Sequence, residues 1–336
     1  MGINYIKFKK TEVKAEMINT YAPEGALIKT SLNREYISSL SGLERAMNEG
    51  RILEGMALLC DSSMRLHIDL YGIKGIIDKR DAVFCRKGED IKDIALITRV
   101  GKPTCFKVLG FERIDGETVA VLSRRAAQEE CLRYYLSSLM SGDIIPARVT
   151  HLESFGAFVD IGCGVSSLLS VDSISVSRIS HPSDRLSVGD SIYTVIKSID
   201  REHERFFVGM KELLGTWEEN AANFEAGQTV SGIIRSVESY GVFVELAPNL
   251  AGLAEIRDGN DERAADAVGK SAAVYIKNII PDKMKIKLVL IDICDNEPPR
   301  SPLNYYIDCE NVTHIDRWRY SPPSAQKLIE SVFEVF

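Results

Sequence analysis

Residues 154 to 169 read SFGAFVDIGCGVSSLL. Phe155 and Phe158 stand three positions apart in a stretch patterned like a β-strand, and side chains three apart on a regular strand point to opposite faces. Gly156 lies between them, where a strand can carry a bulge, and one extra residue would bring both rings to one face. The stretch therefore predicts a strand that displays two aromatic rings together, with a bulge at Gly156.

The same pattern occurs again in the chain, and this repetition is the strongest signal in the sequence. GDIIPARVTHLESFGAFVDIGCGVSSLL is matched by GQTVSGIIRSVESYGVFVELAPNLAGL, in which Tyr240 and Phe243 stand at the places of the two phenylalanines. Each copy continues to a second Gly-led start that reads as two further strands around a turn. Five short strands per copy predict a small barrel.

A third and weaker copy precedes these two. EGMALL, LHIDLYGIKGII and CFKVLGFERIDGETVAVLSRR follow the same order, starting at Glu54, Leu66 and Cys105. Met64 and His67 stand where the aromatic pair would be. We therefore expect a barrel that keeps the scaffold and has lost the aromatic pair.

Helices are expected before and between the copies. YISSLSGLERAMNEG reads as a short helix that leads into the first barrel. SRRAAQEECLRYYLSSLM, from Ser123, and TWEENAANF, in which Thr216 and Glu219 have capping-box spacing, read as linking helices.

The tail after Ile293 combines a linker and an apolar end. It begins with DNEPPRSP and ends with SAQKLIESVFEVF, where Leu328, Val332 and Phe333 have helical spacing. The tail is rich in aromatic residues for a disordered segment, so we expect it to be partly ordered.

Composition narrows the class of protein. A chain of 336 residues with 45% hydrophobic content can form two or three domains with buried cores. The opening MGINYIKFKK has no run suited to a signal peptide, and no apolar stretch approaches the roughly 18 residues of a membrane span. We therefore expect a cytoplasmic chain that does not enter a membrane.

Cysteine and histidine usage indicates no metal centre. The seven cysteines form no Cys-x-x-Cys pair, and the five histidines include no close pair at metal-ligand spacing. We expect reduced thiols, no metal and no cofactor. The sequence also shows no nucleophile with a base and no phosphate loop, so we do not expect an enzyme.

Charge is uneven along the chain. Residues 1–141 hold 22 Lys and Arg against 19 acids, a net charge of +3, whereas residues 142–336 hold 19 against 29, a net charge of −10. A nucleic-acid ligand would therefore be held by local patches and base contacts, since a general positive field is missing.

From about residue 51 to residue 293 the chain resembles the bacterial ribosomal protein S1 family, which strings together S1-type OB-fold domains. The resemblance is carried by FGAFVD, by SISVSRISHPSDRLSVGDSIYTVIKSIDREHERFFVGMKELLGTW and by the link SRRAAQEE. It implies a mainly β chain of three tandem five-stranded barrels joined by short helices, with irregular terminal segments. The implied parts are an N-terminal segment with a short helix over 1–50, a degenerate S1-like barrel over 51–130, S1 domains over 140–214 and 225–293, and a C-terminal tail over 294–336.

The family binds single-stranded RNA with two strand aromatics, a following histidine, and an aspartate and an arginine near the last turn. Carried over residue by residue, the resemblance implies an RNA site of Phe155, Phe158, Asp200 and Arg205 in the second barrel. Ser170 stands where the histidine would be.

The third barrel matches this site less completely. Tyr240 and Phe243 take the aromatic places, but Glu255, Ile280 and Lys285 replace the histidine, the aspartate and the arginine. Around Lys285, the alternating run KMKIKL is expected to place three ammonium groups on one strand face, where phosphates could bind; these are Lys283, Lys285 and Lys287.

These residues have a physical reason to bind RNA and also plainer interpretations. Every unpaired base offers a π-face, so aromatic platforms bind single strands with little sequence preference. A strand phenylalanine can instead belong to a core, and the lysine stripe can be a solvated face. Asp200 and Arg205 can form a surface ion pair, or Asp200 can orient Arg205.

The residues thus predict a non-enzymatic protein that binds single-stranded RNA, and the family resemblance implies that it belongs to the translation machinery, binds mRNA and works with the 30S ribosomal subunit. The alternative is an interaction scaffold whose OB-fold barrels dock on the ribosome or on an RNA-processing enzyme. The departures from the family site at Ser170, Glu255 and Ile280 favour this alternative.

Overall fold

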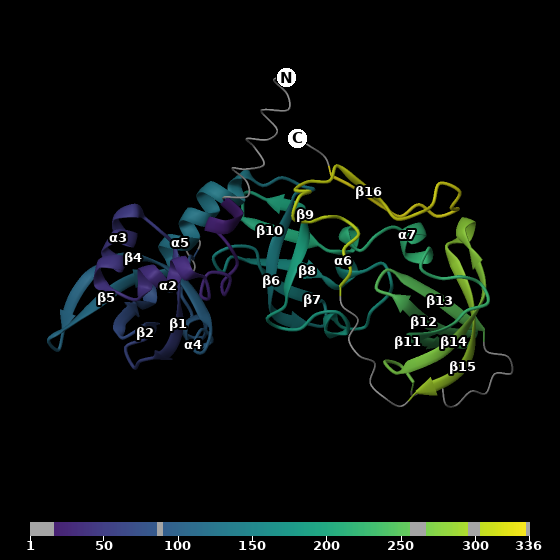
Figure 1. Ribbon diagram of the computed structural model, residues 1–336, viewed down its shortest axis with the longest axis horizontal. Helices are drawn as coiled ribbons and strands as arrows, with labels where there is room; N and C mark the ends of the chain where they lie inside the picture. The colour runs from purple at the N-terminus through teal and green to yellow at the C-terminus, as the bar shows by residue number, and fades with distance from the viewer. Residues whose placement is uncertain (1–16, 86–89, 256–266, 295–302, 334–336) are drawn as a thin grey trace, which may run out of the picture. The chain divides into compact units, whose positions relative to one another are not determined.

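The computed structural model describes residues 17–85, 90–255, 267–294 and 303–333. Within these ranges the chain is mainly β and forms three five-stranded sheets that close as barrels, together with one two-stranded sheet (Figure 1). The prediction of a mainly β chain built from five-stranded barrels is confirmed. The opening MGINYIKFKK and the linker DNEPPRSP lie outside the described residues.

The first barrel has the strand order β1-β2-β3-β5-β4. Its strands are β1 (Leu53–Cys60), β2 (Leu66–Leu70), β3 (Ile73–Ile77), β4 (Pro103–Ile114) and β5 (Glu117–Ser123). The predicted entry helix is a pair of helices, α2 (Ser31–Ile37) and α3 (Leu40–Glu49). Thr30 and Ser39 cap their first turns by accepting hydrogen bonds from backbone N–H groups. The connections of this barrel hold η1 (Lys79–Asp81) and α4 (Asp93–Ile97).

The second and third barrels repeat this arrangement. The second, of order β10-β8-β7-β6-β9, consists of β6 (Ile144–Glu153), β7 (Gly156–Asp160), β8 (Ser166–Ser170), β9 (Ser191–Asp200) and β10 (Arg205–Gly209). The third, of order β11-β12-β13-β15-β14, consists of β11 (Thr229–Glu238), β12 (Gly241–Ala247), β13 (Leu250–Glu255), β14 (Ser271–Ile280) and β15 (Lys285–Cys294). In all three barrels the third and fifth strands pair in parallel. The common topology accounts for the sequence repeat.

Short helical segments join the strands. The link after β5 begins as α5 (Arg124–Glu130) and continues through a π-helical turn (Cys131–Tyr135) and η3 (Leu136–Ser138). Before the third barrel, α7 (Trp217–Ala221) carries the capping box that was predicted for Thr216 and Glu219. The remaining short segments are α6 (Val171–Ile174), η4 (Pro182–Asp184), η5 (Lys211–Leu213) and η6 (Pro281–Lys283).

The chain folds as two compact units. The first unit runs to Leu139 and also includes Pro146–Arg148 and Asp160–Ser166. The second unit holds Met140–Ile145, Val149–Val159 and everything from Ser167 onward. The third barrel and the C-terminal tail therefore belong to the same unit as most of the second barrel.

The tail is ordered over residues 303–333, and its apolar end does not form a helix despite the helical spacing. It forms an antiparallel pair of short strands, β16 (Arg317–Arg319) and β17 (Glu330–Val332). Leu328 is 55% exposed and Val332 is 58% exposed, so the apolar residues at helical spacing do not share a buried face. Strands impose a period of two instead, and Trp318 and Tyr320, two residues apart, are both buried.

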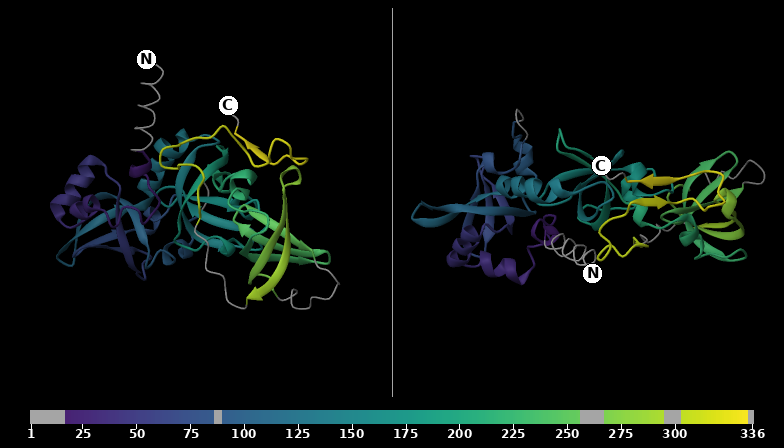
Figure 2. Two further views of the ribbon diagram at one scale, coloured as in Figure 1. Left: turned by 45° about the vertical axis from the view of Figure 1, so that its right-hand side comes forward. Right: turned by 90° about the horizontal axis from the view of Figure 1, so that it is seen from above.

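Residues 303–333, which we call the C-terminal strap, contact both barrels of the second unit. Trp318 and Tyr320 join the core of the third barrel, and Phe333 packs with Ile144 and Val195 of the second barrel. The strap is the yellow segment that runs past both barrels in Figures 1 and 2.

Backbone hydrogen bonds hold the strap in place. The N–H of Ile144 donates to the carbonyl oxygen of Thr313 at 3.0 Å, and the N–H of Ile315 donates to that of Gly142 at 2.9 Å. At the other end, the N–H of Trp217 donates to the carbonyl oxygen of Tyr320 at 3.0 Å. The strap is thus an integral part of the second unit.

We predict that Trp318→Ala strongly destabilises the protein. Truncation of a buried tryptophan costs about 3 to 5 kcal/mol of the free energy of unfolding, because the indole loses its contacts and leaves a cavity. Thermal melts measure the effect, and Leu328→Ala in the exposed part of the strap is the matched control. Equal melting temperatures for the two variants would show that the strap does not pack as described.

Candidate nucleic-acid interface

The aromatic pair of the second barrel lies on one face, as predicted. The rings of Phe155 and Phe158 meet edge to face, with centroids 6.1 Å apart and an interplanar angle of 88°. Phe155 is 54% exposed and Phe158 is half-buried, so neither ring belongs to the core. The interpretation of these two residues as core phenylalanines is therefore wrong.

The predicted cause of this arrangement, a bulge at Gly156, needs correction. Phe155 lies in the turn that precedes β7, and Gly156 is the first residue of that strand, so the strand parity does not apply to Phe155. A Cβ at Gly156 would lie 2.5 Å from the carbonyl oxygen of Leu169 in β8. Glycine is needed here because the neighbouring strand comes close.

The third barrel has the same geometry. Tyr240 and Phe243 meet edge to face at 6.2 Å and 89°, and Tyr240 is 58% exposed. The register irregularity of this hairpin lies in β11, between Ile234 and Ser236, and not at the glycine between the rings. The second and third barrels thus present equivalent aromatic pairs.

Asp200 and Arg205 lie opposite each other where β9 turns into β10. Their side chains do not pair. The Asp200 carboxylate accepts a hydrogen bond from the backbone N–H of His203 at 3.0 Å and lies 2.8 Å from His203 Nδ1. These contacts, led by the backbone hydrogen bond, lower the pKa of Asp200.

Arg205 therefore differs from both earlier interpretations, since Asp200 neither pairs with it nor orients it. The Arg205 side chain is exposed, and no acid in the described part of the chain forms an ion pair with it. An exposed guanidinium of this kind can donate hydrogen bonds to a phosphate or stack against a base.

Ser170 lies beside the aromatic pair, at the position of the family's histidine. The N–H of the next residue, Val171, donates to the carbonyl oxygen of Phe155 at 3.0 Å. The Ser170 hydroxyl donates to Ser173 Oγ at 2.9 Å. The position is thus next to the rings, but a small hydroxyl occupies it.

The lysines of the third barrel form a shorter stripe than predicted. Lys285 and Lys287 are exposed on β15, on either side of the buried Ile286, but Lys283 lies in the turn before the strand. Lys287 pairs with Glu255 at 3.2 Å. Two ammonium groups, and not three, share the strand face.

Sequence reasoning missed two rings near the aromatic pair of the second barrel. His151 on β6 stacks on Phe158, with centroids 6.5 Å apart and an interplanar angle of 23°. Phe207 on β10 is 37% exposed, whereas its neighbour Phe206 is buried. The signal was present in the alternation that follows Arg205, because residues 205 and 207 must face the same way on a strand.

The first barrel carries ion pairs where the other two carry rings. His67 Nε2 lies 3.0 Å from Asp61, and Arg65 Nε lies 3.1 Å from the same carboxylate. Hydrogen bonds with the His67 side chain and the Arg65 backbone lower the pKa of Asp61 to about 2. Lys74 pairs with Glu117 on the same barrel. At the place of the aromatic pair, the described residues of this barrel thus hold an ion-paired histidine and Met64 in place of two rings.

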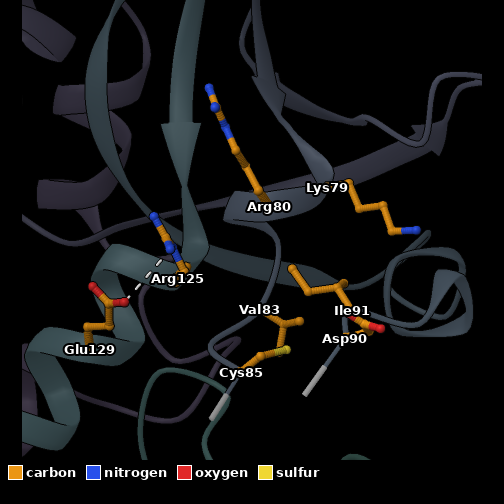
Figure 3. A pocket seen from close by; sticks show the side chains of 8 residues that line it. All are labelled: Lys79, Arg80, Val83, Cys85, Asp90, Ile91, Arg125 and Glu129. Carbon is orange, nitrogen blue, oxygen red and sulfur yellow. Dashed lines mark ion pairs between the residues drawn. The ribbon is translucent and has the colours of Figure 1, made fainter. Parts of the chain in front are cut away.

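A surface pocket of about 640 Å³ lies on the first barrel, next to α5 (Figure 3). Its charges are mixed. Lys79 pairs with Asp93 at 2.5 Å, and Arg125 lies 3.9 Å from Glu129. The pocket is lined by Lys79, Arg80, Val83, Cys85, Asp90, Ile91, Arg125 and Glu129.

Two further properties bear on the class of protein. In the described ranges, no three or more His, Cys, Asp or Glu side chains gather in a way that could hold a metal ion. No helix in those ranges is long and apolar enough to cross a membrane.

Comparison with solved structures finds partial likenesses. GSP13 from Bacillus subtilis is 22% identical and covers 22% of this chain and 57% of its own, with a TM-score of 0.21. A multidomain protein with nucleic acid binding domains from Streptococcus pneumoniae is 13% identical over 72% of this chain and 73% of its own, with a TM-score of 0.24.

Comparison of sequences gives closer relatives. Residues 138–211 match the family model of the S1 RNA binding domain. The small ribosomal subunit protein bS1 of Rhizobium meliloti is 27% identical over 85% of this chain and 50% of its own length. The protein of the same name from Staphylococcus aureus is 37% identical over 44% of this chain and 39% of its own. The chain therefore spans half or less of the length of these two relatives.

The domain match covers the barrel with the more complete site, and the match to a bS1 protein extends over most of the chain. Both agree with the repeated barrels and their aromatic pairs. The domain match and the bS1 relatives together support the resemblance of this chain to the bacterial ribosomal protein S1 family.

Proposed function

We propose that this chain is a non-enzymatic protein of the translation machinery that binds single-stranded RNA. Its S1 domains, over 140–214 and 225–293, would hold unstructured mRNA. The small ribosomal subunit would be its partner in the cytoplasm, as the names of its relatives suggest. The observation that carries the proposal is the presence of an exposed, edge-to-face aromatic pair at the same place in two barrels.

The exposure of these rings supports RNA binding over a structural role. Phe155 and Tyr240 are both more than half exposed, so they contribute little to the stability of their barrels. Bases that are unstacked in a single strand can cover such rings, which a duplex cannot do because its bases are stacked inside.

The charges around the rings support RNA binding that has little base preference and a moderate electrostatic contribution. Arg205 in the second barrel and Lys285 in the third are exposed cations that can contact phosphates. Aromatic rings stack on any base, so the site is expected to accept most bases.

We predict that the double substitution Phe155→Ala and Phe158→Ala lowers RNA affinity without unfolding the protein. Each stacked base contributes about 1 to 3 kcal/mol, so affinity should fall by tens to thousands of fold. Titration with a labelled single-stranded homopolymer and a thermal melt of the same variant measure the two effects.

The matched control for this variant is Met64→Ala with His67→Ala, the equivalent change on the first barrel. We expect it to leave RNA affinity within about twofold, because Met64 and His67 stand where the other barrels have the aromatic pair. A large drop in melting temperature of the Phe variant, with unchanged RNA affinity, would contradict the proposed site. Equal losses for the two double variants would contradict the difference between the barrels.

We also predict a modest dependence of RNA affinity on salt. With a net charge of −10 over residues 142–336, few phosphates are neutralised. About 2 to 4 phosphate contacts give a slope of about −1.4 to −2.8 in a plot of log affinity against log salt concentration. A slope steeper than about −6 would mean that charge, and not stacking, dominates binding.

The RNA recovered after incubation with the protein and magnesium tests the non-enzymatic part of the proposal. We expect it to be intact. Fragments that appear with the wild-type chain and disappear with a control preparation would instead indicate a nuclease.

A further inference from the structure

We propose that Phe207 is a third base-stacking platform, present in the second barrel and absent from the third. The second barrel would then hold RNA mainly by stacking, and the third, which has Lys287 at the equivalent position, would rely more on phosphate contacts. This inference rests on the proposed RNA-binding function and deepens it.

The strand registers of the third barrel define a row of four residues across its outer face. Ser236 on β11 lies opposite Phe243 on β12, which lies opposite Leu253 on β13, which lies opposite Lys287 on β15. The row therefore runs from the strand before the aromatic pair to the last strand of the barrel.

The equivalent row in the second barrel ends in Phe207. Leu168 on β8 lies opposite Phe207 on β10. At the other end, the ring of His151 stacks on that of Phe158. Whether these two pairs lie in one row depends on whether Phe158 on β7 lies opposite Leu168 on β8.

Two observations set that register. The N–H of Val171 donates to the carbonyl oxygen of Phe155, and a Cβ at Gly156 would lie 3.0 Å from Cα of Ser170. Gly156 therefore faces Ser170. Counting two residues inward on both antiparallel strands places Phe158 opposite Leu168.

The row of the second barrel is thus His151, Phe158, Leu168 and Phe207, where the third barrel has Ser236, Phe243, Leu253 and Lys287. Adjacent strands lie about 4.8 Å apart, so Phe207 lies roughly 10 Å from Phe158 across β8. Leu168 is half-buried and closes the gap with apolar surface. The row therefore brings Phe207 to the same face as His151 and Phe158, whose ring contacts that of the exposed Phe155.

The burial pattern of β10 shows that Phe207, unlike Phe206, does not pack in the barrel core. Phe206 and Val208 are buried, whereas Arg205 and Phe207 point outward. A phenyl ring 37% exposed beside a guanidinium is a suitable surface for a base and its phosphate.

In the third barrel the same place carries charge. Lys287 is exposed, Lys285 precedes it on the same strand face, and Glu255 lies 3.2 Å from Lys287. An ammonium group offers no π-face, so this end of the row can attract a phosphate but cannot stack on a base. The two barrels should therefore respond differently to salt.

The test is RNA titration of the full chain with labelled single-stranded oligo(A) about 12 nucleotides long at several salt concentrations. Phe207→Ala should weaken binding at least about fivefold, the effect of losing one stacked base. Phe207→Lys, which copies the third barrel, should weaken binding at high salt and steepen the salt slope by about 0.7. Lys287→Phe should make the slope shallower by a similar amount.

The matched control is Tyr275→Ala, which removes a ring of similar exposure, 39%, from β14 outside the row. It should change affinity by less than about twofold. Thermal melts of all variants should agree closely, because each changed side chain is partly exposed.

Several outcomes would overturn the inference. If the wild-type chain binds RNA and the Phe155/Phe158 variant does not, but Phe207→Ala behaves like Tyr275→Ala, the proposed function stands and the third platform is wrong. A Phe207→Ala variant that melts well below the wild type would make Phe207 a packing residue. Absence of RNA binding by the wild-type chain would overturn the proposed function and this inference together.

Discussion

The close approach of β7 to β8 at Gly156 is the constraint on which the aromatic face depends. Any side chain there would meet the carbonyl oxygen of Leu169, and the same holds at Gly241, where a Cβ would lie 2.6 Å from the carbonyl oxygen of Ala254. Neither glycine has a positive φ angle, so space and not backbone conformation selects glycine. The tight hairpin places one ring in the turn and the next on the strand, and both face outward.

The first barrel shows what happens without this constraint. Arg65, two residues before His67, takes the place of the glycine in this barrel. The connection between β1 and β2 is five residues long. Arg65 and His67 both contact Asp61, so the hairpin is closed by polar contacts in place of rings. The glycine and the aromatic pair therefore occur together in the second and third barrels, and both are missing from the first barrel.

Much of this arrangement could be predicted from the sequence, because it depends on local pattern. The repeat, the five strands per barrel, the capping box at Thr216 and the paired rings all follow from spacing within short segments. The mechanism that pairs the rings could not be predicted, because a turn and a bulge both bring residues three apart to one face. The partner of Asp200 was also not predicted. Both His203, three residues further along the chain, and Arg205, opposite Asp200 on the next strand, could pair with its carboxylate, and the sequence does not decide between them.

The two short strands of the strap could not be predicted, for a different reason. Short apolar segments suit a helix or a strand equally well, and what decides between them is the surface that receives them. Here that surface is made by residues far away in the sequence, such as Ile144 and Val195, which bury Phe333. No pattern within the tail contains this information.

The strap has a consequence for how the two aromatic barrels act on one ligand. Because it packs on both, neither barrel diffuses freely about a flexible linker, and the conformational entropy of their connection is lost on folding and not on binding. An RNA strand bound to one barrel is held near the other barrel, so its second contact is intramolecular. Under the proposed function, the two aromatic pairs would act as one bivalent site with a longer residence time, although no contact to the ligand is added.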